Sequence, residues 1–490
     1  MVKRTLTSAV FVVLSFALTT AQAPPAAQRA PSTKGVVVMG KAPVSETVLK
    51  VVLPKAQHAD LASGVHLIVL EDHRAPQVSV QIQMRGAGGY YDPADMPGLA
   101  SVTAAMVSEG TKTRTSQQIA TELDTLAASA YAGTSSASET TVLSMGAMTE
   151  HLDKVLDVAT DMLLNPTFPE QELAKYKTRM KGSLLQQRAQ PGFLAQEAYG
   201  RVVFGSHPAG RMMTAEALDK ITREAIVNFH ATRYAPDYAY IGVVGDVTLA
   251  DIKKRLDTKL AGWTKKGLPE PAVADPAAIG AARVTVVDRP GSVQTNLIVG
   301  TQMINRTSPD YDVLRLADSI IGGGPTGRLF LNLREDKGYT YGSYSRMTTL
   351  RYRGDWSASA EVRTDVTEPA LAEMVKEIAR MRDERIPDKE FADKKRSLVA
   401  SFALSLETPG AILSNYIVSY IYKLPANYWD QYPARVMAIT QDQVQAAAKK
   451  YLDASQLQIV AVGDGKKIAE GLKKFGKVQM FDTEGKPISQ

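Results

Sequence analysis

The sequence predicts an α+β fold made of two homologous lobes, each a mainly antiparallel sheet packed with helices. Strand-like alternation opens each half of the chain, helical periodicity follows it, and the two halves repeat one another at a fixed offset. Gly245-Asp246 recurs 218 residues later as Gly463-Asp464, and Pro191-Gly192 recurs at the same offset as Pro409-Gly410. Landmarks that stay in register in this way indicate a duplicated domain.

The predicted elements follow the same order in both lobes. Strands are expected over 65–70 and 77–84 in the first lobe and over 283–288 and 295–301 in the second. Amphipathic helices are expected over 152–164 and 371–381. Longer helices with a proline in the first turn are expected over 169–189 and 387–406, and a last strand over 238–245 or 456–463 closes each lobe.

Changes in composition along the chain predict the domain boundaries. Residues 1–23 have the features of a signal peptide, with Lys3 and Arg4 before an apolar run and Ala21-Gln22-Ala23 as the cleavage pattern. Residues 24–45 are rich in Pro and Ala, which predicts a disordered lead-in. We expect a first lobe over 46–264, a Pro/Ala/Gly linker over 265–282, a second lobe over 283–478 and a tail over 479–490.

The residue inventory excludes several function classes. The chain has no Cys, which excludes disulfides, thiolate metal sites and cysteine nucleophiles. Its net charge of +6 is dispersed without a Lys/Arg block, so we expect no nucleic-acid partner. The apolar run of the leader is too short to span a bilayer, and no stable membrane insertion is expected. Export without disulfides favours the bacterial periplasm.

Residues 97–111 have the frame of a metallopeptidase helix, but small side chains stand where metal ligands belong. Ser101, Ala104 and Ala105 supply neither an imidazole nor a carboxylate, which a zinc hydrolase requires. In this frame the chain resembles the pitrilysin/insulinase-type (inverzincin) metallopeptidases, whose active members carry H-x-x-E-H at these three positions. The downstream zinc-ligating Glu of that family falls near residues 185–187, where Gln186 and Gln187 replace carboxylates.

The histidines do not offer a second metal site. There are six, and none forms a pair at helical i, i+3 or i+4 spacing. His66 and His73 bracket a predicted strand and, seven residues apart, are expected on opposite faces. The second lobe has no His. The sequence therefore predicts scattered structural or surface histidines and no metal-binding residues.

The second lobe carries a different feature between Gly322 and Tyr341. Gly338 is expected to end a helix in a left-handed cap, and Tyr341 is expected on the next strand, sharing a face with Tyr339. From the residues alone, the better interpretation is that Arg334 is a helix C-terminal cation and that the tyrosines are ordinary strand aromatics. The resemblance implies instead that Arg334 and Tyr341 are substrate-binding residues.

The neighbouring residues receive structural interpretations. Arg328 is interpreted as structural. Residues 322–324 predict a flexible turn and not a phosphate cradle, because no Gly-Lys-Ser/Thr follows them.

The resemblance implies a function as well. In this family some enzymes divide the work between a zinc-bearing chain and a zinc-less chain that face each other as halves of a clamshell, as in mitochondrial-processing-peptidase-like bacterial heterodimers. The chain is expected to be the non-catalytic, substrate-binding subunit of a heterodimeric zinc metalloendopeptidase that degrades unfolded peptides. Zinc is expected in the homologous partner. The alternative is a scaffold or peptide-binding protein with no role in proteolysis.

Overall fold

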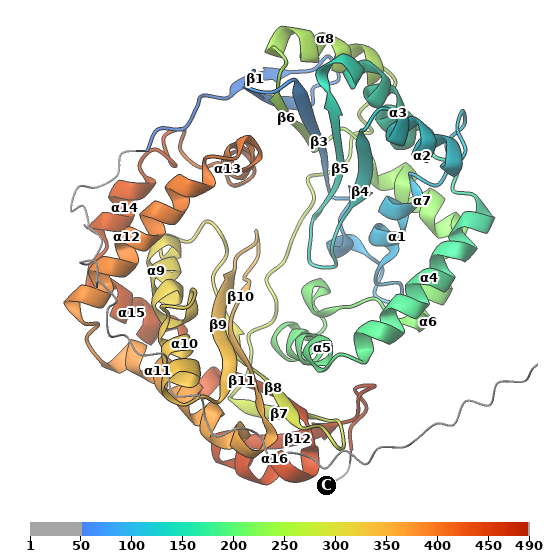
Figure 1. Cartoon of the computed structure of the whole chain (residues 1–490). Helices are drawn as coiled ribbons and strands as arrows, with labels where there is room; N and C mark the ends of the chain where they lie inside the picture. The colour runs from blue at the N-terminus through green and yellow to red at the C-terminus, as the bar shows by residue number, and fades with distance from the viewer. Residues whose placement is uncertain (1–50, 489–490) are drawn as a thin grey trace, which may run out of the picture. The chain divides into compact units, whose positions relative to one another are not determined.

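The computed structural model describes residues 51–488, which lie in one compact unit and form two six-stranded sheets (Figure 1). The predicted signal peptide and lead-in lie outside the described residues. In spatial order, the first sheet contains β1 (Gln57–Asp60), β2 (His66–Glu71), β6 (Ala239–Gly245), β3 (Gln77–Arg85), β5 (Thr140–Met148) and β4 (Ser129–Gly133). The second contains β12 (Lys477–Phe481), β7 (Arg283–Asp288), β11 (Gln458–Gly463), β8 (Gln294–Gln302), β10 (Asp355–Arg363) and β9 (Thr340–Thr348).

The two sheets share one strand order, which confirms the predicted two-lobe α+β fold. β2 and β6 run parallel, as do β7 and β11, and both sheets continue with antiparallel pairs toward β4 and β9. The outermost strand on the other side differs, because the start of the first lobe supplies β1, antiparallel to β2, whereas the end of the chain supplies β12, parallel to β7. The predicted tail from residue 479 is therefore wrong at its start, since Lys477–Phe481 pairs with β7 and completes the sheet.

The helices repeat in the same order in both lobes, and α4, α5 and α7 begin 218 residues before their equivalents α12, α13 and α15, the offset of the sequence landmarks. Those of the first lobe are α1 (Leu99–Met106), α2 (Ser116–Thr125), α3 (Leu152–Leu164), α4 (Glu170–Arg188), α5 (Pro191–Phe204), α6 (Ala215–Lys220), α7 (Arg223–Arg233) and α8 (Leu249–Lys259). Those of the second are α9 (Tyr311–Gly322), α10 (Arg328–Phe330) with the π-helical η4 (Leu331–Asp336), α11 (Thr367–Asp383), α12 (Asp388–Ser405), α13 (Pro409–Tyr422), α14 (Tyr432–Ala438), α15 (Gln441–Tyr451) and α16 (Gly465–Leu472).

One detail of the helix prediction is corrected. Pro169 and Pro387 were expected in the first turns of α4 and α12, but each is the residue before the helix, with ψ of 133° and 135°. An extended ψ at this position lets the chain enter the helix from a loop, and the fixed φ of proline suits it.

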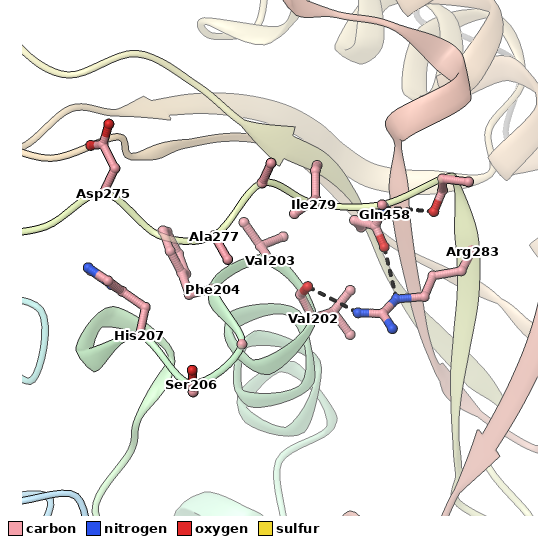
Figure 2. A pocket seen from close by; sticks show the side chains of 14 residues that line it. Val202, Val203, Phe204, Ser206, His207, Asp275, Ala277, Ile279, Arg283 and Gln458 are labelled. Atoms are coloured by element: carbon pink, nitrogen blue, oxygen red, sulfur yellow. Dashed lines mark hydrogen bonds between the residues drawn. The ribbon is translucent and has the colours of Figure 1, made fainter.

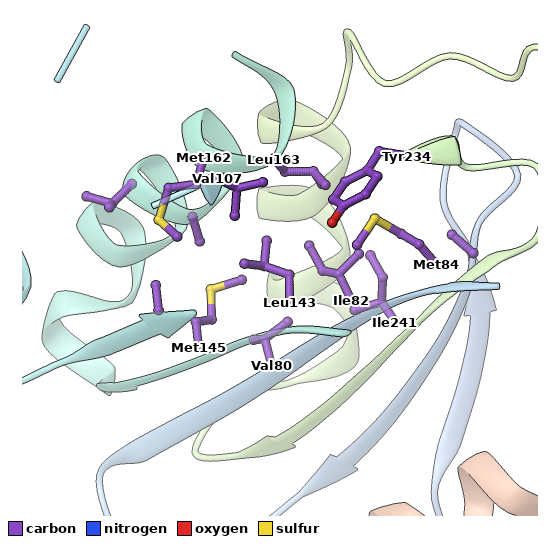
Figure 3. Packing of buried hydrophobic residues seen from close by; sticks show 14 of the residues in the cluster. Val80, Ile82, Met84, Val107, Leu143, Met145, Met162, Leu163, Tyr234 and Ile241 are labelled. Atoms are coloured by element: carbon purple, nitrogen blue, oxygen red, sulfur yellow. The ribbon is translucent and has the colours of Figure 1, made fainter. Parts of the chain in front are cut away.

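The core of the first lobe lies between the sheet and the helices α1, α3 and α7. Strand residues that alternate along β3, β5 and β6 point into it, as Figure 3 shows for Val80, Ile82, Leu143, Met145 and Ile241, all of which are buried. Helices bring Val107, Met162 and Leu163 onto the same face (Figure 3). Alternate residues of the strands and one face of each helix thus form a single apolar layer.

The opposite face of each sheet is covered by a helix of the other lobe. α5 packs on the second sheet against Val287, Ile298 and Val460, and its equivalent α13 packs on the first sheet against Ile68 and Tyr240. Both faces of the central strands are therefore buried, which explains why β6 and β11 are apolar at nearly every position. Two equivalent helices, 218 residues apart, bind the lobes together.

Candidate functional site

The degenerate motif lies on α1, the short helix under the first sheet. Ala104 is buried, Ser101 and Ala105 are half-buried, and the Ser101 hydroxyl donates only a long hydrogen bond of 3.4 Å to the Thr134 carbonyl. The start of the helix is well built, because an Asp92 carboxylate accepts the backbone N–H groups of Gly98 (2.7 Å) and Ala100 (2.8 Å). Burial raises the pKa of Asp92 to about 6. The scaffold of the motif is thus retained while its ligands are replaced.

The position of the downstream zinc-ligating Glu of the resembled family is also occupied by amides. Gln186 and Gln187 lie exposed near the end of α4, and the Gln187 amide donates to the Ser183 hydroxyl one turn earlier. Within residues 51–488, no three His, Asp or Glu side chains converge closely enough to hold a metal ion. The residues at 101, 104, 105 and 187 carry no chemistry for binding zinc or for taking a proton from water.

Most histidines have structural partners. His207 and His230 contact the carbonyls of Ala274 and Leu163, and His73 pairs with Asp246. His151 lies 3.9 Å from the Glu150 carboxylate. The prediction of scattered histidines is wrong for the other two, because His58 and His66 lie 3.1 Å apart, nitrogen to nitrogen, on neighbouring strands. A search at helical spacing misses such a pair, whereas the short β1–β2 connection is the signal that would have found it.

Arg334 and Tyr341 lie on one helix–strand corner of the second lobe. α10 continues into η4, a π-helical segment that ends at Asp336, two residues before Gly338. The N–H of Gly338 donates to the Arg334 carbonyl (3.1 Å) and that of Tyr339 to the Leu333 carbonyl (2.8 Å). Gly338 has φ of +63°, which confirms the predicted left-handed cap and explains why glycine occupies this position.

A β-bulge sets the orientation of Tyr341. Ser343 pairs with Ala360 and Thr340 with Val362, so Tyr341 and Gly342 together face the single residue Glu361. Regular alternation would have put Tyr341 on the buried face that Ser343 occupies, and the bulge turns it out instead. Its side chain is 90% exposed. The prediction that Tyr339 shares this face is wrong, because Tyr339 precedes the strand and packs against the core of the second lobe.

Two exposed tyrosines, Tyr341 and Tyr344, lie at this corner, where the Phe330 ring is buried. The Arg334 guanidinium lies 4.8 Å above the centre of the Phe330 ring and pairs with Glu335 at 3.5 Å. The Tyr344 ring lies 5.6 Å from Phe330 on the same strand as Tyr341. Among the described residues, no hydrogen bond joins Arg334 to Tyr341. Both side chains are exposed, so their polar groups face solvent.

The neighbouring residues hold this corner in place. Arg328 is 6% exposed and donates two hydrogen bonds of 2.8 Å to the Glu390 carboxylate of α12, which agrees with its structural interpretation. The expected flexible turn at 322–324 is tightly packed at Gly322, where a Cβ atom would lie 2.3 Å from the Ser345 backbone nitrogen of β9. Glycine at this position thus allows the end of α9 to approach the strand.

A cavity of about 520 Å³ lies where the end of α5 meets the linker and the second sheet (Figure 2). Its polar groups are bonded to the protein: Arg283 donates to the Val202 carbonyl (3.1 Å) and to Gln458 (3.0 Å). His207 lines the other end and contacts the linker carbonyl of Ala274 at 3.0 Å. These hydrogen bonds connect the linker and the second sheet to the first lobe. They use the polar groups of the lining for structure, so the cavity contains no set of reactive groups.

The helices of the two lobes are short or polar compared with membrane spans. Between residues 51 and 488 no single helix is long and apolar enough to cross a bilayer, while α12 and α13 satisfy the criterion only together, as a pair bent by 109°.

Known proteins share this arrangement. Residues 67–210 match the family described as Insulinase (Peptidase family M16), and residues 220–398 match the family described as Peptidase M16 inactive domain. A Bacillus subtilis protein named uncharacterized zinc protease YmxG is 23% identical over 358 residues, which cover 72% of this chain and 85% of that protein. A Helicobacter pylori protein named non-peptidase homolog YmxG is 22% identical over 406 residues, covering 82% and 93%.

A solved structure is similar over both lobes. The crystal structure of a peptidase M16 inactive domain from Pseudomonas fluorescens has a TM-score of 0.77 and 27% sequence identity, and the match covers 84% of this chain and 98% of that one.

Proposed function

Because the chain belongs to peptidase family M16, the insulinase family, and has Ser101, Ala104 and Ala105 at the zinc-motif positions, we propose that it is a non-catalytic, substrate-binding subunit of a zinc metalloendopeptidase. Its partner is a homologous chain that carries the zinc and the general base. The substrate is an unfolded peptide, and the complex works after export, in the bacterial periplasm.

The exposed corner at Arg334 and Tyr341 carries this proposal. A bulge costs a sheet one regular pairing, and here it presents a tyrosine to solvent at 90% exposure beside an arginine. At 90% exposure the Tyr341 side chain contributes little to packing, so the core of the lobe does not require an aromatic ring at this position. A guanidinium and a phenol both donate hydrogen bonds, which suits them to the carbonyl oxygens of an extended peptide.

The adjacent strand offers the peptide a place to bind. β9 is the end strand of the second sheet and pairs only with β10 within the described residues, so its outer backbone groups face away from the sheet. An extended peptide can add to such an edge as a further strand. Arg334 and Tyr341 then orient its backbone toward the zinc of the partner, which supplies the hydrolytic chemistry. Positioning of this kind accelerates a reaction without bond chemistry in the positioning subunit.

A direct test compares the isolated chain with its mixture with the zinc-bearing partner. We expect the isolated chain to leave an unstructured fluorogenic peptide intact and the mixture to cleave it in a chelator-sensitive reaction. Arg334→Ala with Tyr341→Phe is expected to lower kcat/KM of the mixture about 10- to 100-fold. Arg385→Ala, which removes an exposed arginine from the end of α11, is the control and is expected to change nothing.

Two outcomes contradict parts of the proposal. Cleavage by the isolated chain that survives the chelator would mean that this chain is itself catalytic. A fully active mixture containing the Arg334→Ala/Tyr341→Phe variant would exclude the orienting role.

Peptide binding without any cleavage in the mixture would favour the second candidate, a scaffold or peptide-binding protein. The similarity to a Helicobacter pylori chain named non-peptidase homolog supports that candidate.

A further inference from the structure

Two imidazole rings face each other across the β1–β2 hairpin of the first lobe. Asp60 pairs with His66 in the antiparallel register, and His58 lies two residues before Asp60, so all three side chains share one face. The Nδ1 atom of His58 lies 3.1 Å from the Nε2 atom of His66. The two rings are nearly stacked, with centroids 5.4 Å apart.

The His66 ring is held in one orientation. Its Nδ1 atom lies 2.9 Å from an Asp60 carboxylate oxygen, and the Tyr420 ring of α13 stacks on it at 4.5 Å and 5°. A carboxylate bound to Nδ1 holds the proton there and leaves a lone pair on Nε2, the atom that faces His58. This arrangement of carboxylate, imidazole and free nitrogen is the one that orients histidine ligands in metal proteins.

We propose that His58 and His66 form a bidentate site for a divalent transition-metal ion, with Asp60 as the outer carboxylate that orients His66. Two nitrogens at about 2.0–2.1 Å from one ion are about 2.9 Å apart at a right angle and about 3.4 Å apart at a tetrahedral angle. The observed 3.1 Å lies between these values. In the absence of metal, His58 Nδ1 donates its proton to His66 Nε2, and on metal binding His58 carries its single proton on Nε2 instead, so that both facing nitrogens offer a lone pair to the ion.

The surroundings favour binding. The His58 Nδ1 and His66 Nε2 atoms face each other at 3.1 Å, so one ion can reach both. His58 is exposed, which gives an ion access. Since no third His, Asp or Glu joins the pair within residues 51–488, water completes the coordination. Imidazole ligands bind Cu²⁺ more tightly than Zn²⁺.

The site differs in place and role from the degenerate motif on α1. Tyr420 stacks on His66, and Tyr416 lies edge-on to His58 with ring centroids 6.2 Å apart. Both tyrosines belong to α13, the second-lobe helix that packs on the first sheet. A bound ion therefore rigidifies the hairpin against which this helix rests, and metal is expected to raise the melting temperature of the chain.

Calorimetric titration of the chelator-treated chain without an affinity tag tests the proposal, with CuSO₄ or ZnCl₂ as the only ligand. We expect one ion per chain, with Cu²⁺ bound more tightly than Zn²⁺. His58→Ala and His66→Ala are each expected to remove the binding, and Asp60→Asn to weaken it about 10- to 100-fold. His151→Ala, which removes a separate surface histidine, is the matched control and is expected to bind as the parent chain does.

Electron paramagnetic resonance of the Cu²⁺ complex gives a second readout, in which two coupled nitrogens are expected in the parent chain. Saturable binding that persists in the His58→Ala/His66→Ala variant would overturn the proposal, as would no binding by the parent chain. Each variant is checked by thermal unfolding without metal, so that a lost site is distinguished from a lost fold. None of these outcomes depends on the proposed peptidase partnership.

Discussion

Gly300 provides a sharp test of how the two lobes are joined. It lies near the end of β8, on the face that α5 covers. A Cβ atom at this position would lie 2.1 Å from the Tyr199 hydroxyl and 2.4 Å from the Trp356 carbonyl. Tyr199 donates a hydrogen bond of 3.0 Å to that same carbonyl and is fully buried. Gly300→Ala must therefore displace the hydroxyl from its acceptor and move α5.

The expected magnitude follows from three contributions. Forcing a methyl group into a packed interface costs about 1–3 kcal/mol. Separating a buried hydroxyl from its acceptor costs about 1–3 kcal/mol more. Replacing glycine by alanine within a strand returns about 0.5–1 kcal/mol of conformational entropy. We expect a net loss of about 1–5 kcal/mol in the free energy of unfolding.

A glycine under α13, the equivalent of α5, supplies a control. Gly242 of β6 lies under α13, but its Cβ atom would meet only the methyl ends of Ile417 (2.9 Å) and Leu413 (3.2 Å). These methyl groups can rotate away, so Gly242→Ala is expected to change stability by less than about 1 kcal/mol. Urea unfolding followed by circular dichroism and tryptophan fluorescence measures both variants.

A double variant decides whether the hydroxyl is the cause. Tyr199→Phe removes the atom nearest to the added methyl group, so Gly300→Ala is expected to cost at least about 1 kcal/mol less in this background. Equal costs in the two backgrounds, or equal costs of Gly300→Ala and Gly242→Ala, would refute the reasoning.

Two further predictions concern buried charge. Glu390→Gln removes the carboxylate that Arg328 contacts at 2.8 Å through two nitrogens and is expected to lower the free energy of unfolding by about 2 kcal/mol in urea titrations. Its first-lobe equivalent Glu172 pairs only with an exposed lysine, and Glu172→Gln is expected to stay within about 0.5 kcal/mol, so equal losses would contradict the assignment. Burial lowers the pKa of His230 from 6.5 to about 4. Between these two pH values the unfolded chain binds a proton at His230 that the folded chain does not, so the free energy of unfolding falls on acidification, by about 3 kcal/mol in total. His230→Gln is expected to reduce the fall in the free energy of unfolding between pH 7 and pH 4.5. Unfolding curves of the variant with the same pH dependence as those of the parent chain would contradict this assignment.

Much of the fold could be predicted from sequence because it rests on local patterns. Arg283–Asp288 and Leu152–Leu164 have the predicted bounds, since alternation and helical periodicity depend only on which face is buried. The tail was misjudged because β12 is short and its pairing with β7 joins residues almost 200 positions apart. The location of α5 and α13 was also not predictable, since an apolar helix does not specify which sheet it covers.

The candidate site divides in the same way. The absence of ligands at Ser101, Ala104 and Ala105 follows from residue type alone, since neither a methyl group nor a hydroxyl replaces an imidazole. The left-handed cap at Gly338 was also predictable, because glycine is suited to positive φ. The bulge that exposes Tyr341 was not, because it depends on the register between β9 and β10.

The sequence by itself therefore determined the duplicated architecture and the loss of the metal motif, since both depend on residue identity and spacing along the chain. Only the tertiary structure decided that equivalent helices cover each other's sheets, that Tyr341 faces solvent and that two histidines meet across a hairpin. Each of these depends on contacts between segments whose relative position is set by packing and strand register, which local periodicity does not encode.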